Sequence, residues 1–242
     1  MWLFLRVLYH RRLYDPEVRL MKRCKHMKSF LQKYKHIWAF SYGLIYLPWF
    51  LWLENHVTTN YHIIHSPLDD YIPFIEYFIV PYLLWFLFVA AAVLYFFFTS
   101  REEFYRLFVT LAIGMTAFLI VSTVFPNGLN LRPTVFPRDN IFTDMVKALY
   151  AMDTPTNVLP SIHVYNTLAV CFAISHNETL RKHRLISGGA YVLAALIILA
   201  TMFLKQHSVI DVCSASLLAC TIYLVVYVPA GKSVARMSRQ TI

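Results

Sequence analysis

The sequence is poor in charged residues. Only 14% of its 242 residues are Asp, Glu, Lys or Arg, whereas 58% are hydrophobic. Soluble domains carry roughly 25% charged residues. Low-complexity segments and internal repeats are also absent. With a mean hydropathy of +0.52, this composition excludes a disordered chain and predicts an integral membrane protein.

Closely spaced cysteine pairs are absent as well. The four cysteines form no CxxC motif, and three of them lie inside apolar runs, at Cys171, Cys213 and Cys220. Cys24 lies in a basic segment. We therefore expect neither a disulfide framework nor a zinc site.

Long apolar runs dominate what is present. Six runs approach the ~20 residues that cross a bilayer as a helix: 37–53, 73–99, 104–125, 161–175, 185–204 and 208–229. They are continuously apolar rather than alternating, which favours helices over a lipid-facing β-barrel. The sequence predicts an all-α, polytopic membrane bundle with six transmembrane helices.

Basic residues are distributed unevenly along the chain. Eighteen of the 22 Lys and Arg residues fall in four segments, residues 1–36, 99–106, 176–184 and 231–242. The positive-inside rule therefore predicts that both termini are cytoplasmic in a multi-pass protein of the cell membrane. This distribution also disfavours nucleic acid as the partner of the positive charge. We predict a basic cytoplasmic or interfacial segment (1–36), a membrane core (37–230) and a cytoplasmic tail (231–242).

Two long connections are predicted to lie on the outer side, at 54–72 and 126–160. The second is rich in Pro and Asn and is expected to contain a short interfacial helix near 140–151. Long ordered connections of this kind often cover a functional site. The first contains four possible metal ligands, which we treat as a weaker alternative site: His62, His65, Asp69 and Asp70.

Polar residues mark the outer ends of three predicted helices. Arg132 follows the third run, Ser161 and His163 open the fourth, and His207 and Asp211 open the sixth. Ionisable side chains at membrane depth are costly and indicate a functional site by default. Each residue alone has an ordinary structural explanation, but their meeting on one predicted side favours a site.

The spacing of these residues suits phosphoryl transfer. His207 and Asp211 are four residues apart on one helix face, so the carboxylate fixes the imidazole tautomer and leaves the other nitrogen free as nucleophile or base. His163 lies next to a helix N-terminus capped by Ser161, where unpaired backbone N–H groups attract an anion. Fixed positive charge completes the requirements of phosphoryl transfer.

Three short segments resemble the motifs of the type 2 phosphatidic acid phosphatase superfamily of membrane lipid phosphatases and phosphotransferases. The family motifs K-x6-R-P, P-S-G-H and S-R-x5-H-x3-D correspond to "FPNGLNLRP", "PSIH" and "ATMFLKQHSVID". The order and spacing match. The six-run region from about 37 to 230 is also consistent with the fold of that family.

The sequence departs from the family motifs at four positions. Phe125 replaces the Lys of the first motif, Ile162 replaces Gly, and Ala200-Thr201 replaces Ser-Arg. These departures resemble the inositol phosphorylceramide synthase branch and its bacterial relatives. Lys205 and Arg138 are our candidates for the missing phosphate-binding charges.

The resemblance implies a role for each matched residue. His207 is the nucleophile, Asp211 orients it, and His163 is the acid and base. Arg132 and Ser161 bind the phosphoryl oxygens, without a metal ion or other cofactor. The implied partners are membrane lipids and a lipid phosphate substrate at the extracytoplasmic leaflet.

Three functions stay open at this point. The chain is a lipid phosphatase, a phosphotransferase that passes a phospho-head-group to a lipid hydroxyl, or an inactive lipid-binding relative. A transporter is disfavoured because the two halves show no repeat symmetry. The sequence predicts neither the lipid nor the oligomeric state.

Overall fold

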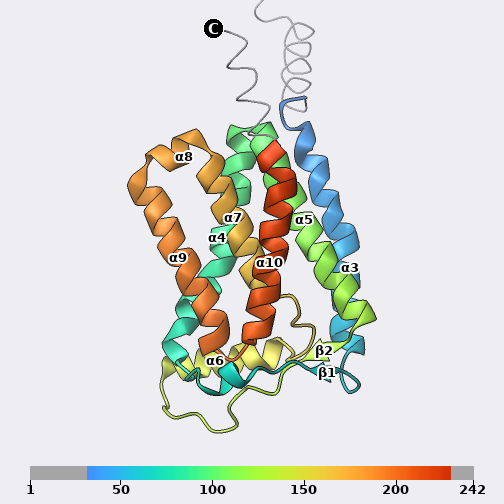
Figure 1. Cartoon of the computed structure of the whole chain (residues 1–242), viewed down its shortest axis with the longest axis vertical. Coiled ribbons are helices and arrows are strands. Elements are labelled where there is room, and N and C mark those ends of the chain that lie inside the picture. The colour runs from blue at the N-terminus through green and yellow to red at the C-terminus, as the bar shows by residue number, and fades with distance from the viewer. Residues whose placement is uncertain (1–31, 230–242) are drawn as a thin grey trace, which may run out of the picture. The chain divides into compact units, whose positions relative to one another are not determined.

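The computed structural model describes residues 32–229, which are mostly helical (Figure 1). The chain divides into two compact units, Met1–Ser41 and Tyr42–Ile242. The predicted segment 1–36 falls largely outside the described residues, and the predicted tail 231–242 falls entirely outside them. The 3₁₀ helix η1, Lys35–Tyr42, begins in the first unit. The predicted all-α class is confirmed for the described residues.

The described part of the second unit contains six longer helices on the six predicted runs, joined by shorter elements. The longer helices are α3 (Gly43–His56), α4 (Ile79–Thr99), α5 (Arg101–Val124), α7 (Ile162–His176), α9 (Arg184–Phe203) and α10 (Val209–Val226). The shorter elements are β1 (His62–Ile63), η2 (Pro67–Asp70), η3 (Glu76–Phe78), β2 (Asn127–Gly128), α6 (Ile141–Met152) and α8 (Glu178–Lys182).

Four helices in the described residues are long and apolar enough to cross a membrane. They are Glu76–Thr99, Arg101–Val124, Arg184–Phe203 and Val209–Val226. Large apolar side chains such as Leu87, Val124 and Leu217 are exposed on them, and exposed apolar surface of this extent indicates a membrane protein. α3 and α7 have only 14 and 15 residues. The predicted number of six crossing helices is therefore not confirmed.

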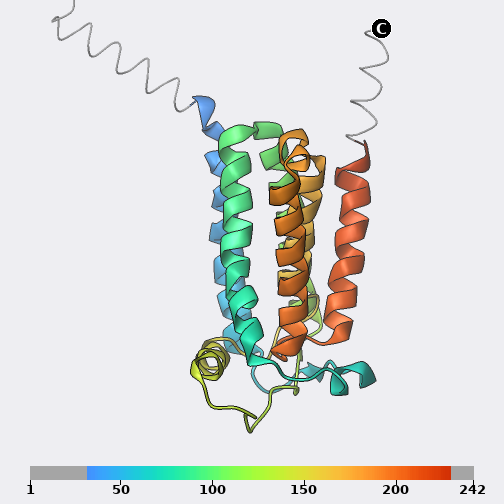
Figure 2. The same ribbon diagram turned by 90° about the vertical axis from the view of Figure 1, so that its left-hand side faces the viewer.

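The long connections gather at one end of the helical unit. α3, α5 and α9 finish there, and α4, α7 and α10 begin there (Figures 1 and 2). The predicted short helix is present as α6, and it lies across the ends of the longer helices. The two predicted outer connections are therefore on one side of the unit.

α7 is the central helix of the unit and contacts α4, α5, α9 and α10. A close approach to α5 depends on Gly114, because a Cβ atom there would lie 1.9 Å from the Tyr165 ring. The Tyr165 hydroxyl donates to the Thr110 carbonyl over 2.7 Å. This packing buries the first turn of α7 among its neighbours.

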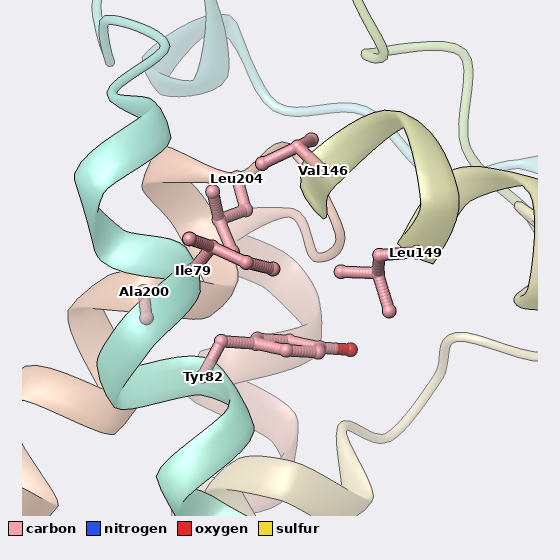
Figure 3. Packing of buried hydrophobic residues seen from close by; sticks show 6 residues of the cluster. All are labelled: Ile79, Tyr82, Val146, Leu149, Ala200 and Leu204. Atoms are coloured by element: carbon pink, nitrogen blue, oxygen red, sulfur yellow. The ribbon is translucent and has the colours of Figure 1, made fainter. Parts of the chain in front are cut away.

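An apolar cluster holds α6 against α4 and α9. Val146 and Leu149 of α6 pack with Ile79 and Tyr82 of α4 and with the end of α9, as Figure 3 shows. Val146 is fully buried. The amphipathic character of α6 therefore fixes the second long connection over the start of α4.

The two long connections, 54–72 and 126–160, are also tied to each other by backbone pairing. β1 and β2 run parallel, with His62 opposite Asn127 and Ile63 opposite Gly128. A Cβ atom at Gly128 would lie 2.7 Å from the Pro155 carbonyl oxygen, so only glycine permits this approach. The pairing positions residues 154–159, which precede α7.

Candidate functional site

The first turn of α7 presents His163 as predicted. Ser161 is the N-cap, and its hydroxyl accepts a bond from the Val164 N–H over 3.4 Å. His163 is the second residue of the helix. The first N–H groups of a helix have no intrahelical partner and favour an anion.

His163 packs between two aromatic rings of α4 and His207, the histidine of the third motif. Its ring centroid lies 4.7 Å from Tyr82, 4.3 Å from Trp85 and 5.6 Å from His207. The Nδ1 atom of His163 is buried and has no hydrogen-bond partner among the described residues. The structure therefore brings together the two histidines that the sequence singled out.

His207 is oriented by Asp211, as the four-residue spacing predicted. The His207 Nδ1 atom lies 3.4 Å from Asp211 Oδ2. The same oxygen accepts the Ser208 N–H over 2.9 Å in a capping box at the start of α10. Because Nδ1 faces the carboxylate, Nε2 is the ring nitrogen left for chemistry.

A carboxylate from the first long connection, Asp69, supports the same segment. Asp69 is buried, and it accepts bonds from the Ser208 hydroxyl over 2.6 Å and the Val209 N–H over 2.8 Å. Its backbone carbonyl accepts the Lys205 ammonium over 2.8 Å. Asp69 thus connects a distant loop to the residues on both sides of His207.

A cavity of about 440 Å³ lies beside the two histidines. Its lining is mostly apolar and includes Phe50, Phe86 and Phe118 of α3, α4 and α5. Both His163 and His207 line it. Such a cavity accommodates an amphiphile whose polar part reaches the histidines.

Arg132 lies behind the cavity rather than in its lining. Its guanidinium donates to the Asp153 carbonyl over 2.8 Å and to the Gln206 side-chain oxygen over 2.6 Å. It also stacks on the Tyr150 ring at 4.5 Å. Burial lowers the pKa of Arg132, whereas the nearby Asp153 carboxylate raises it. Arg132 therefore orients Gln206, which directly precedes His207.

The two other candidate phosphate cations are engaged elsewhere. Lys205 donates to the carbonyls of Asp69 and Ile72. Arg138 forms two bonds with the Glu76 carboxylate, over 2.6 and 2.9 Å. Neither cation lines the cavity, so this arrangement gives their predicted phosphate-binding role no support.

The comparisons with known proteins concern the C-terminal half of the chain. Residues 126–234 match the model of the PAP2 superfamily. Neither the curated proteins nor the solved structures gave a match. The PAP2 match includes Arg132, His163, His207 and Asp211, which are the residues selected from the motifs.

The residues of the weaker alternative metal site do not form a cluster. His65 bonds Asp70 over 2.9 Å, whereas His62 stacks on Phe125 at 4.5 Å. The Asp69 carboxylate accepts a hydrogen bond from the Ser208 hydroxyl. Within residues 32–229, no group of three His, Cys, Asp or Glu side chains is arranged to hold a metal ion.

Several site residues lie before the segment that matches the PAP2 superfamily. Tyr82 and Trp85 of α4 and Glu54 of α3 line the cavity. The aromatic pair was indistinguishable from lipid-facing residues in the sequence. Glu54 could have been predicted as a site residue from the sequence, because a carboxylate at the end of an apolar run is costly unless it has a role.

Asp153 and Gln206 were missed for a different reason. Both line the cavity, yet each lies in a connection whose path depends on distant contacts. Burial raises the pKa of the Asp153 carboxyl, while the charge of Arg132, 4.0 Å away, lowers it. These residues make the cavity less cationic than the sequence suggested.

Proposed function

We propose that the chain is a PAP2 superfamily member that hydrolyses a phosphomonoester or diphosphate of a lipid through a phosphohistidine intermediate, without a metal ion. PAP2 superfamily members are generally phosphatases or phosphotransferases. The observation that carries the proposal is the pair His163 and His207, which meet at a cavity with His207 bonded to Asp211.

In the first step, His207 Nε2 attacks phosphorus. A P–N bond forms, the P–O bond to the lipid breaks, and His163 donates a proton to the leaving oxygen. Asp211 stabilises the positive imidazole through Nδ1. In the second step, His163 takes a proton from water as the water oxygen attacks phosphorus and the P–N bond breaks.

The phosphoryl oxygens need donors near the histidines. The backbone N–H groups at the start of α7 supply part of this requirement, next to the Ser161 cap. The Gln206 Nε2 group is buried without a hydrogen-bond partner among the described residues and lines the cavity. Arg132 contributes by holding Gln206. Direct contacts from Ser161 and Arg132 remain predictions from the motifs, and those from Lys205 and Arg138 remain predictions from the positive charge that the motifs lack in this chain.

The site is proposed to face the extracytoplasmic leaflet of the cell membrane. In the predicted arrangement of six crossing helices with cytoplasmic termini, the long connections lie outside. The opposite end of the unit bears Arg101, Arg181 and Lys182 near helix ends, which the positive-inside rule assigns to the cytoplasm. The lipid tails then lie along the apolar part of the cavity.

A phosphotransferase of the inositol phosphorylceramide synthase type is the second candidate. The cavity favours it because most of its lining is apolar, which allows a lipid hydroxyl to approach the phosphohistidine in place of water. The first step is unchanged, and His163 takes its proton from the acceptor hydroxyl.

Phosphate release from phosphatidic acid by the purified full chain, in the presence of EDTA, tests the proposal. We expect His207→Ala and His163→Ala each to reduce turnover at least ~10³-fold. The matched control is His183→Ala, at an exposed histidine on the opposite end, which keeps turnover. Activity that survives His207→Ala contradicts the mechanism. Neither phosphate release nor transfer of the phospho-group to a diacylglycerol acceptor, from any lipid phosphate, indicates the inactive relative.

A further inference from the structure

The cavity has a second polar wall, formed around Glu54. The Glu54 carboxylate accepts the Thr154 hydroxyl over 2.6 Å and the Asn157 amide N–H over 2.8 Å. Thr156 joins this wall through a 2.9 Å bond to Thr154. All four residues line the cavity that also contains His163 and His207.

The charges in this cavity do not suit a simple anion. Glu54 and Asp153 both line it, and no Lys or Arg of the described residues does. Arg132 is the cation nearest Asp153. It lies behind the lining, and its guanidinium is 4.0 Å from the Asp153 carboxylate. Like charges in a water-poor cavity repel strongly. A phosphate that enters without compensating positive charge is therefore disfavoured.

Unpartnered buried polar atoms occur along the cavity lining. Asn157 is only 6% exposed, and its Oδ1 acceptor has no hydrogen-bond partner among the described residues. On the histidine side the unpartnered atoms are two donors, Trp85 Nε1 and Gln206 Nε2, together with His163 Nδ1 and Asn166 Oδ1. Buried polar atoms without partners are rare and call for an explanation, such as a bound group. The Asn157 acceptor beside the Glu54 carboxylate matches an N–H donor, and the two donors match phosphoryl oxygens.

We propose that the substrate carries a protonated amine close to its phosphate, and that Glu54 and Asn157 bind that amine. This inference rests on the proposed function and specifies its substrate class. The ammonium supplies the positive charge that the lining lacks and donates to Glu54 and to Asn157 Oδ1. Asn157 adopts a left-handed backbone conformation, with φ of 56°, which is uncommon for a non-glycine residue.

Two kinds of lipid have this chemistry. In a phosphomonoester, the amine belongs to the lipid backbone, as in sphingosine 1-phosphate. In a phosphodiester, which is a substrate for the phosphotransferase candidate, it belongs to the head group, as in phosphatidylethanolamine. In either lipid, His207 forms the P–N bond as the P–O bond to the lipid breaks, and His163 protonates the released lipid oxygen. The amine keeps its protons throughout.

Binding to the full chain in detergent tests the inference without relying on turnover. The His207→Ala variant is used so that the lipid is not consumed. Lipid-induced shifts in melting temperature give the dissociation constants for two matched pairs: short-chain phosphatidylethanolamine against phosphatidylglycerol, and sphingosine 1-phosphate against short-chain phosphatidic acid. We expect the amine-bearing member of at least one pair to bind about tenfold more tightly. The pair that shows the preference identifies the source of the amine.

The preference should depend on the acidic wall. In the same background, Glu54→Gln is expected to reduce it to less than about threefold, and so is Asn157→Gly, which keeps the left-handed backbone. Glu102→Gln is the charge-matched control, because Glu102 is exposed and bonded to Arg106. It should leave the preference intact.

Three results overturn the inference: no preference in either pair, a preference that persists in Glu54→Gln, or equal binding of phosphatidylcholine, which has no N–H donor. Turnover of the wild-type chain is measured in parallel. Turnover without an amine preference rejects the inference and keeps the proposed function. An amine preference without turnover rejects the proposed function alone.

Discussion

At the residue scale, the polar side chains of this apolar chain are held by specific bonds. Local rules predicted those within one turn: Ser161 caps α7, and His207 bonds Asp211. Bonds between distant segments were not predictable. Arg132 binds Gln206, 74 positions away, and Lys205 binds the Asp69 carbonyl, 136 positions away. The motifs located both cations near the site but gave no information on where their charges point.

Asp153 allows a prediction of how stability depends on pH. Burial raises the pKa of its carboxyl above the ordinary value of 3.8, and the Arg132 charge reverses only part of the shift. The folded state therefore binds the proton more tightly than the unfolded state, and stability falls as pH rises through the interval between the two pKa values. We expect Asp153→Asn to raise the melting temperature in detergent at pH 7, by an amount that shrinks toward pH 4.

The exposed Asp139 provides the control for this measurement. Its carboxylate is 90% exposed and lies 3.4 Å from Lys147, so Asp139→Asn should change the melting temperature little at either pH. A lower melting temperature for Asp153→Asn at pH 7 would mean that the Arg132 contact outweighs burial.

At the element scale, hydropathy predicted the helices well and the connections poorly. All six runs contain a helix, and α6 appears where a short helix was expected. The β1–β2 pairing, by contrast, depends on a close approach at Gly128 between segments far apart in the chain. The Ser66–Asp69 capping box follows a local sequence pattern and was therefore predictable. The bonds of Asp69 to the start of α10 were not, because they depend on the tertiary fold.

Asp69 is predicted to act as a positioning residue for His207. In Asp69→Asn, the side chain loses its charge and one acceptor of the Ser208 and Val209 bonds, so the start of α10 loosens. We expect kcat to fall about tenfold while KM changes by less than about twofold, and the free energy of unfolding to drop by about 1–3 kcal/mol. Steady-state kinetics and denaturant titration measure these effects.

The adjacent Asp70 is the matched control for Asp69. Its carboxylate is 64% exposed and bonds only His65 in the described residues. Asp70→Asn should leave kcat, KM and stability near their wild-type values. Equal effects of the two substitutions would show that the loop acts through its overall charge, not through the Ser208 and Val209 contacts.

At the scale of the whole molecule, the second unit combines an apolar outer surface with polar groups at one end. The PAP2 match covers residues 126–234, but the cavity also needs α3, α4 and α5. The motifs therefore predicted the histidine side of the site. The opposite wall could not be predicted from the sequence, because Glu54 contacts Thr154 and Asn157, which lie about a hundred positions further along the chain.

Labelling of single cysteines tests the proposed orientation. In a variant whose four cysteines are replaced by alanine, Asp139→Cys lies at the end with the long connections, and Glu178→Cys lies at the other end; both positions are exposed. A membrane-impermeant maleimide should label the first in intact cells and the second only after permeabilisation. The reverse pattern would put the site on the cytoplasmic side.

The central claim is that His207 carries the phosphoryl group during turnover. Rapid acid-free quenching of the full chain with a lipid phosphate, followed by peptide mass spectrometry, tests it most directly. We expect an acid-labile phosphoryl adduct on His207 in the wild-type chain, no adduct in His207→Ala, and slower formation of the adduct in His163→Ala, because the first step then lacks its acid. Turnover without any adduct on His207, or an adduct on another residue, would contradict it.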